Sequence, residues 1–183
     1  MKRTLSPRPA DLLALAASLA LPCGCHPAAE VEAAPQLELR IPAGEAASIG
    51  SYAVIVRWPD GPADRIAGER DGSVNAVWFT DLDQDGRGEV VVSMSSAGSG
   101  SYGQLQGWRR GEDGLWRLIE LPGLDPDQAV GYRGHDRFEL VDGVLRREFP
   151  VFLEPDANAA PTGGTRRLVL AATGARWSDA TGG

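Results

Sequence analysis

Cysteine and histidine are nearly absent from this chain, and their scarcity limits what it can do. Both cysteines, Cys23 and Cys25, lie within the first 25 of 183 residues, so the rest of the chain cannot form a disulfide. His26 and His135 are the only histidines, too few ligands for a zinc site of the His/Cys type. A hydrolytic triad needs a nucleophile, a base and a group that orients the base, and the sequence offers no such set. We therefore expect no enzyme.

Long apolar runs are also missing, apart from LLALAASLAL near the start of the chain. This run is shorter than a membrane-spanning helix needs. Lys2, Arg3 and Arg8 precede it and PCGC follows it directly, which is the layout of an export signal. The sequence therefore predicts a signal peptide over residues 1–24.

Cys25 is the candidate lipidation site. Leu21 followed by Gly24 and Cys25 resembles a bacterial lipoprotein cleavage site, although the leucine stands one position further upstream than usual. Cleavage by an ordinary signal peptidase near residues 27–29 is the alternative. Residues 25–36 have the Ala/Pro/Glu composition of a tether, and residues 37–183 form a single domain. This layout predicts export to a bacterial envelope, with a membrane contact only through the lipid; the resemblance described below implies the periplasm or envelope of a Gram-negative bacterium.

Lysine is absent after the signal peptide. Removing residues 1–24 takes away three basic residues and one acidic residue, which leaves 15 arginines, 24 carboxylates and a net charge near −9. Such a surface disfavours nucleic acid as a partner and favours a basic protein, because opposite fields speed encounter. The alternative is that the acidity serves only solubility.

Short segments of alternating apolar and polar residues dominate the rest of the chain, and Gly, Pro, Asp and Asn clusters separate them. No long helix is available for a parallel crossover, which favours an antiparallel sandwich or barrel. We expect an all-β fold, an antiparallel β-sandwich of about eight strands. The candidate strands are residues 36–41, 51–58, 74–79, 88–96, 103–108, 115–121, 137–141, 144–149 and 166–172.

The turn DLDQDGRGE is a candidate calcium site, because it places Asp81, Asp83, Asp85 and Glu89 around Gly86. Hard Ca²⁺ prefers several oxygens, and glycine permits the tight turn that brings them together. It is not a complete EF-hand loop, whose twelfth position would be glutamate. In the alternative interpretation, the turn is solvated and its Asp side chains bond to their own backbone. No cofactor is required in either case.

The loop SSAGSGSYG joins two predicted strands with more residues than a tight hairpin needs. Gly98, Gly100 and Gly103 remove side-chain bulk, so the loop can fold narrowly, and Tyr102 ends it. The segment GYRGHDRF offers Arg133, His135 and Asp136 as hydrogen-bonding groups that hold loops together, a structural role rather than acid–base chemistry.

The order of these segments carries a resemblance. DLDQDGRGEVVV, SAGSGSYG, GYRGHDRF, FPV and NAAPTGGTRRL together resemble the periplasmic inhibitors of invertebrate-type (i-type) lysozyme, over about residues 48–177. The resemblance implies a β-sandwich without catalysis, an i-type lysozyme as protein partner, and an inhibitory Ser-Gly-x-Tyr loop. That loop would comprise Ser99, Gly100, Ser101 and Tyr102.

The inhibitory loop has a physical rationale. A narrow loop can enter a cleft made for a polysaccharide, where a serine hydroxyl can donate to a catalytic carboxylate. Tyr102 would be an aromatic anchor. We expect loop support from Gly98, Gly103, Tyr132, His135 and Asp136. The competing function is a calcium-stabilised binding or structural module of the cell envelope; a slack loop, with Tyr102 folded back on the sandwich, is the competing structure.

Overall fold

The computed structural model describes residues 34–180. The predicted signal peptide, Cys25, His26 and almost all of the predicted tether lie outside this range. In the part that is described, no helix has the length and apolar character that crossing a membrane requires.

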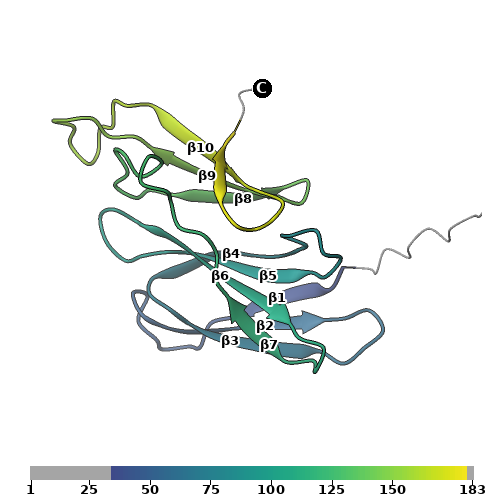
Figure 1. Ribbon diagram of the computed structural model, residues 1–183. Helices are drawn as coiled ribbons and strands as arrows, with labels where there is room; N and C mark the ends of the chain where they lie inside the picture. The colour runs from purple at the N-terminus through teal and green to yellow at the C-terminus, as the bar shows by residue number, and fades with distance from the viewer. Residues whose placement is uncertain (1–33, 181–183) are drawn as a thin grey trace, which may run out of the picture. The chain divides into compact units, whose positions relative to one another are not determined.

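The described chain forms three antiparallel sheets (Figure 1). The first sheet has the order β1-β2-β3, the second β4-β5-β6-β7 and the third β11-β10-β9-β8. The bounds are β1 Gln36–Arg40, β2 Gly50–Arg57, β3 Asp64–Arg70, β4 Ser73–Thr80, β5 Glu89–Ser95, β6 Gly103–Arg110, β7 Trp116–Ile119, β8 Arg137–Val141, β9 Val144–Pro150, β10 Thr165–Leu170 and β11 Trp177–Asp179.

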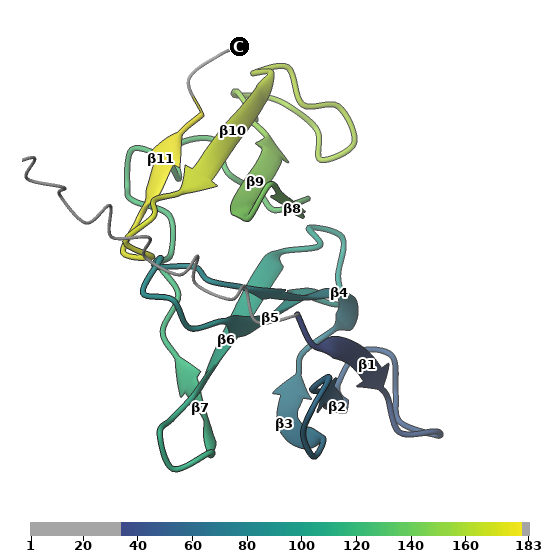
Figure 2. The ribbon, with the colours of Figure 1, turned by 90° about the vertical axis from the view of Figure 1, so that its right-hand side faces the viewer.

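The β4–β7 sheet packs against the other two sheets, one on each face, and Figures 1 and 2 both show it between them. Strand β5 therefore has both faces buried. Val90, Val92 and Met94 face a core with β2 and β3, while Val91 faces a second core with β9 and β10. A strand covered on both sides is a continuous apolar run rather than an alternating one, as in EVVVSM.

The prediction of an all-β antiparallel fold is confirmed, but the expected number of strands was too low. The structure has two further strands, β3 and β11, in segments where no strand is expected from the sequence. In β3 only Ile66 and Ala67 are apolar, and Gly68 replaces a core side chain because it lies under the ring of Tyr52. Strand β11 has three residues, of which only Trp177 is buried. Neither segment carries the alternating pattern that identifies a strand.

The segments VDG and RGEDG form two hairpins. Asp142 and Gly143 both have positive φ, 51° and 75°, as a two-residue type I′ turn requires between β8 and β9. The other hairpin joins β6 to β7. It lies at the opposite end of β6 from residues 96–102, the glycine-rich loop that joins β5 to β6. Strand β6 thus fixes that loop at one end and a tight hairpin at the other.

Candidate functional site

The glycine-rich loop, residues 96–102, connects β5 to β6, and its ends are fixed by strand pairing. Ser95 pairs with Gly103 at the last register position of the two strands. Ser96 closes the loop further, because its amide donates to the Tyr102 carbonyl at 2.9 Å and its hydroxyl accepts from the Tyr102 amide at 3.0 Å. The loop is therefore closed at its base and is not slack.

Residues 98–102 form the tip of the glycine-rich loop. The Ser101 amide donates to the Gly98 carbonyl at 3.1 Å, which makes the tip a tight turn. A Cβ at Gly100 would collide with the ring of Tyr102, so glycine leaves the space that this ring occupies. Ser99 is exposed, and its hydroxyl makes no hydrogen bond to any residue within 34–180.

Tyr102 is 47% exposed, and one edge of its ring meets Tyr132 at a centroid distance of 5.6 Å. The interplanar angle of 77° is that of an edge-to-face aromatic pair. Tyr102 thus rests on the protein with one side and presents the other to solvent. It is neither folded into the core nor detached from it.

The segment 131–136 packs against the tip and holds it by a hydrogen bond. The backbone amide of His135 donates to the Gly100 carbonyl at 2.7 Å. Gly134 has φ +89° and lies so close to that carbonyl that a side chain would collide with it. The contribution of His135 is therefore made by its backbone; its imidazole lies over Phe152, with ring centroids 6.1 Å apart.

Asp136 fixes the start of β6. Its carboxylate accepts hydrogen bonds from the Gly103 amide at 2.7 Å, from the Tyr132 hydroxyl at 2.5 Å and from Arg147 Nε at 2.7 Å. The side chain of Asp136 is fully buried and that of Arg147 is 8% exposed. Burial and the adjacent carboxylate raise the pKa of Tyr132, so its phenol remains a hydrogen-bond donor. The first residue of β6, which directly follows the loop, is thus attached to a buried ionic network.

Arg147 is the centre of this network and was not foreseen from the sequence. Its guanidinium carbon lies between 5.3 and 5.9 Å from four ring centroids, those of Tyr132, Phe138, Phe149 and Trp177. A signal existed in the segment VLRREF, where Arg147 shares one strand face with Leu145 and Phe149. An arginine between two inward-facing apolar residues indicates a buried partner of opposite charge.

The acidic turn lies at the other end of β5. One carboxylate oxygen each of Asp81, Asp83 and Glu89 lies within 4.8 Å of the others, whereas Asp85 is not part of this group. Asp85 caps the Arg87 amide at 2.9 Å. Asp81 accepts from two amides of its own turn, at 2.9 and 3.1 Å, as the alternative interpretation expects.

Arg109 supplies a positive charge to this acidic group. It donates to Glu89 at 2.7 Å and to Asp83 at 2.5 Å. Burial raises the pKa of Glu89, whose side chain is fully buried and also accepts from the Leu82 amide at 2.9 Å. The predicted calcium site stays a prediction, and a guanidinium already neutralises part of it.

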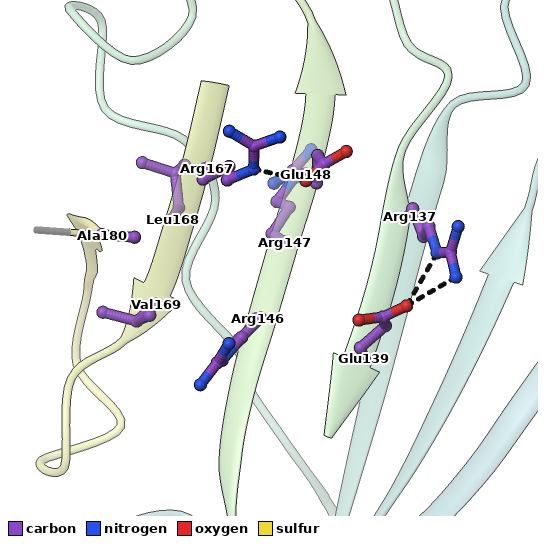
Figure 3. Close-up of a pocket in the computed structure, with 9 residues that line it drawn as sticks. All are labelled: Arg137, Glu139, Arg146, Arg147, Glu148, Arg167, Leu168, Val169 and Ala180. Atoms are coloured by element: carbon purple, nitrogen blue, oxygen red, sulfur yellow. Dashed lines mark hydrogen bonds and ion pairs between the residues drawn. The ribbon is translucent and has the colours of Figure 1, made fainter. Parts of the chain in front are cut away.

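A pocket of about 620 Å³ lies on the β8–β11 sheet (Figure 3). Arginine and glutamate alternate across its strands: Arg137 pairs with Glu139, and Arg167 with Glu148. Arg146 points away from both pairs. The charges of this face are largely compensated within the sheet, and the pocket includes none of the residues of the glycine-rich loop.

The fold and the loop define a small all-β binding protein that presents a rigid, glycine-rich tip. The sequence matches the model of the family of periplasmic lysozyme inhibitors of I-type lysozyme over residues 36–131, just over half of the chain. The chain belongs to this family. Its members are inhibitors, which confirms the expectation that the chain is not an enzyme. The matched range contains the glycine-rich loop and the acidic turn and ends before Tyr132.

Solved structures give the same family name. The inhibitor from Aeromonas hydrophila in complex with lysozyme from Meretrix lusoria is 30% identical, with 49% of this chain and 77% of that chain covered and a TM-score of 0.38. The Aeromonas inhibitor alone is 26% identical, with 51% and 92% covered and a TM-score of 0.40. A comparison with curated protein sequences finds no match.

Proposed function

We propose that this chain inhibits an i-type lysozyme by inserting the tip of the glycine-rich loop into the active-site cleft. Membership of the inhibitor family supports the activity and the partner. One observation favours this loop as the inhibitory element. Its tip is exposed, yet the His135 amide holds the Gly100 carbonyl and the Asp136 carboxylate holds the amide of Gly103, which follows the tip. A loop that merely connected two strands would not need such support.

The chemistry of the tip suits a glycosidase cleft. Such clefts contain a pair of carboxylic acids. The exposed hydroxyl of Ser99 can donate to one of them, and a hydrogen bond to an ionised acceptor is stronger than a neutral one. The exposed side of the Tyr102 ring can occupy a sugar subsite. Because the tip is already ordered, little conformational entropy is lost on binding.

Alanine variants of the two side chains test this proposal. Loss of a central aromatic anchor costs on the order of 2 kcal/mol, so we expect Tyr102→Ala to bind i-type lysozyme roughly thirtyfold more weakly. Ser99→Ala should also weaken binding, because a desolvated carboxylate of the lysozyme would lose its donor. Binding is measured by calorimetry and inhibition by lysis of cell-wall substrate.

Thermal stability is the control for both variants. It should remain close to that of the parent protein, since both side chains are exposed. If both variants inhibit i-type lysozyme as well as the parent, or the parent inhibits none, the proposed function is wrong.

The family places its members in the periplasm. We further propose that Cys25 carries a lipid that anchors this chain to the envelope. The support is the sequence pattern around Cys25, and residues 25–33 would then connect the lipid to the described domain. An anchored inhibitor would meet lysozyme at the membrane surface rather than free in solution.

A calcium-stabilised envelope module is the second candidate function. The observation that favours it is the approach of Asp81, Asp83 and Glu89 to within 4.8 Å. In that case, the acidic turn would bind the ion and the glycine-rich loop would have no lysozyme partner. Both functions allow calcium to contribute to stability; only the first requires inhibition.

A further inference from the structure

A second loop, residues 152–162 between β9 and β10, is attached to the inhibitory tip. The Asn158 side-chain amide donates to the Ser99 carbonyl at 3.0 Å, across 59 residues of sequence. Arg133 makes a second connection: its carbonyl lies beside Gly100, and its guanidinium donates to the Asp156 carbonyl at 2.9 Å. The two loops therefore form one continuous surface.

The 152–162 loop is well ordered by internal hydrogen bonds. The carboxylate of Asp156 accepts from the Leu153 amide at 2.7 Å and from the Thr162 amide and hydroxyl, both at 2.8 Å. These backbone donors lower the pKa of Asp156. The Asp156 carboxylate thus connects the second residue of the loop with its last. Because the loop is already ordered, it would lose little conformational freedom when a partner covers it.

Apolar side chains are exposed in this loop and just before the segment 131–136. Leu153 is 52% exposed and Val130 is 65% exposed. A hydrogen bond of 2.8 Å from the Phe152 amide to the Gly131 carbonyl holds their two segments together. Isolated exposed apolar residues are ordinary on a protein surface. Here Leu153 lies in the loop that bonds Ser99 through Asn158, and Val130 lies two residues before Tyr132, whose ring meets that of Tyr102.

The size of protein interfaces also requires a second element. A stable interface buries about 800 Å² on each partner and involves about 20–30 residues a side. The tip of five residues cannot provide this area alone. The loops bonded to it are the surfaces that a lysozyme reaches when the tip is inserted.

We propose that the 152–162 loop is a second contact element for the same lysozyme, with Leu153 as its apolar contact. This inference rests on the proposed function. The loop lies outside the range matched by the family model.

Leu153→Asp tests the inference, with Leu115→Asp as the matched control. Leu115 is 62% exposed and lies in the β6–β7 hairpin, about 26 Å from the tip along the eight residues of β6. We expect Leu153→Asp to weaken binding of purified i-type lysozyme by about tenfold or more, as for an interface anchor. Leu115→Asp should leave binding unchanged. Both substitutions add the same charge, so they share any long-range electrostatic effect.

Asn158→Ala provides a second measurement. It should weaken binding and speed amide hydrogen exchange in residues 99–102, because the tip loses one hydrogen bond. If Tyr102→Ala weakens binding while Leu153→Asp and Leu115→Asp both bind like the parent, this inference is overturned and the proposed function stands. If Tyr102→Ala also binds like the parent, the proposed function itself has failed.

Discussion

Replacing Asp136 by alanine should destabilise the protein far more than replacing an exposed carboxylate of strand β9. Asp136 accepts three hydrogen bonds, and its removal leaves the guanidinium of Arg147, 8% exposed, without a counter-ion. Breaking a buried ion pair from one side costs about 3–5 kcal/mol. For a domain of this size, that corresponds to a fall in Tm of about 6–20 °C.

The matched control is Glu148→Ala. Glu148 pairs with Arg167 at 2.8 Å, but both side chains are about half exposed or more, so the pair is screened by solvent. Such exposed pairs contribute about 0–1 kcal/mol. Urea denaturation of both variants gives the two free energies of unfolding directly, and thermal melting gives an independent ranking.

A double variant identifies the cause of the loss. Adding Arg147→Met to Asp136→Ala removes the unpaired charge and keeps a long apolar side chain among the aromatic rings. If the cost arises from the unpaired guanidinium, the double variant should recover much of the lost stability. Equal stabilities for Asp136→Ala and Glu148→Ala would refute this argument, because burial would then make no difference.

Two further predictions concern the anchor and the acidic turn. Wild-type protein should fractionate with membranes and Cys25→Ser should be released or fail to mature; a wholly soluble wild type beginning near Ala29 would exclude the anchor. Arg109→Gln should destabilise the protein by about 1–3 kcal/mol, because buried Glu89 loses its charged donor. If the turn binds calcium, millimolar calcium should raise the Tm of this variant above its value in chelator, and more than in wild type. Equal melting curves in both conditions would leave only a hydrogen-bonded acidic turn.

Local sequence patterns predicted most of the fold. The apolar run of β5 reflects burial on both of its faces. The residues of the VDG hairpin reflect the two positive φ angles that its turn requires. Strand β3 could not be found in this way, since its place in the sheet depends on Gly68 fitting under Tyr52. That contact joins two strands and leaves no periodic signal in β3.

The site was predicted less completely. Gly100 and Tyr102 belong to a short motif, and the sequence analysis named Asp136 as a hydrogen-bonding residue. Its partner Arg147 and the contact of Asn158 with Ser99 arise from a different sheet and a different loop. Such pairings depend on how the sheets pack, and Arg147 has the same residue type as its exposed neighbour Arg146.

The pairing of Ser95 with Gly103 has a consequence for variation of the inhibitor. Because the pairing of β5 with β6 fixes both ends of the loop, the exposed side chains of the loop are not needed for folding. Ala97 and Ser99 can be exchanged for other side chains while Ser96, Gly100 and Gly103 preserve the frame. The loop is thereby divided into residues that hold its frame and exposed positions that can vary. A library of variants at Ala97 and Ser99 would alter which cleft is recognised without lowering the stability of the sheets.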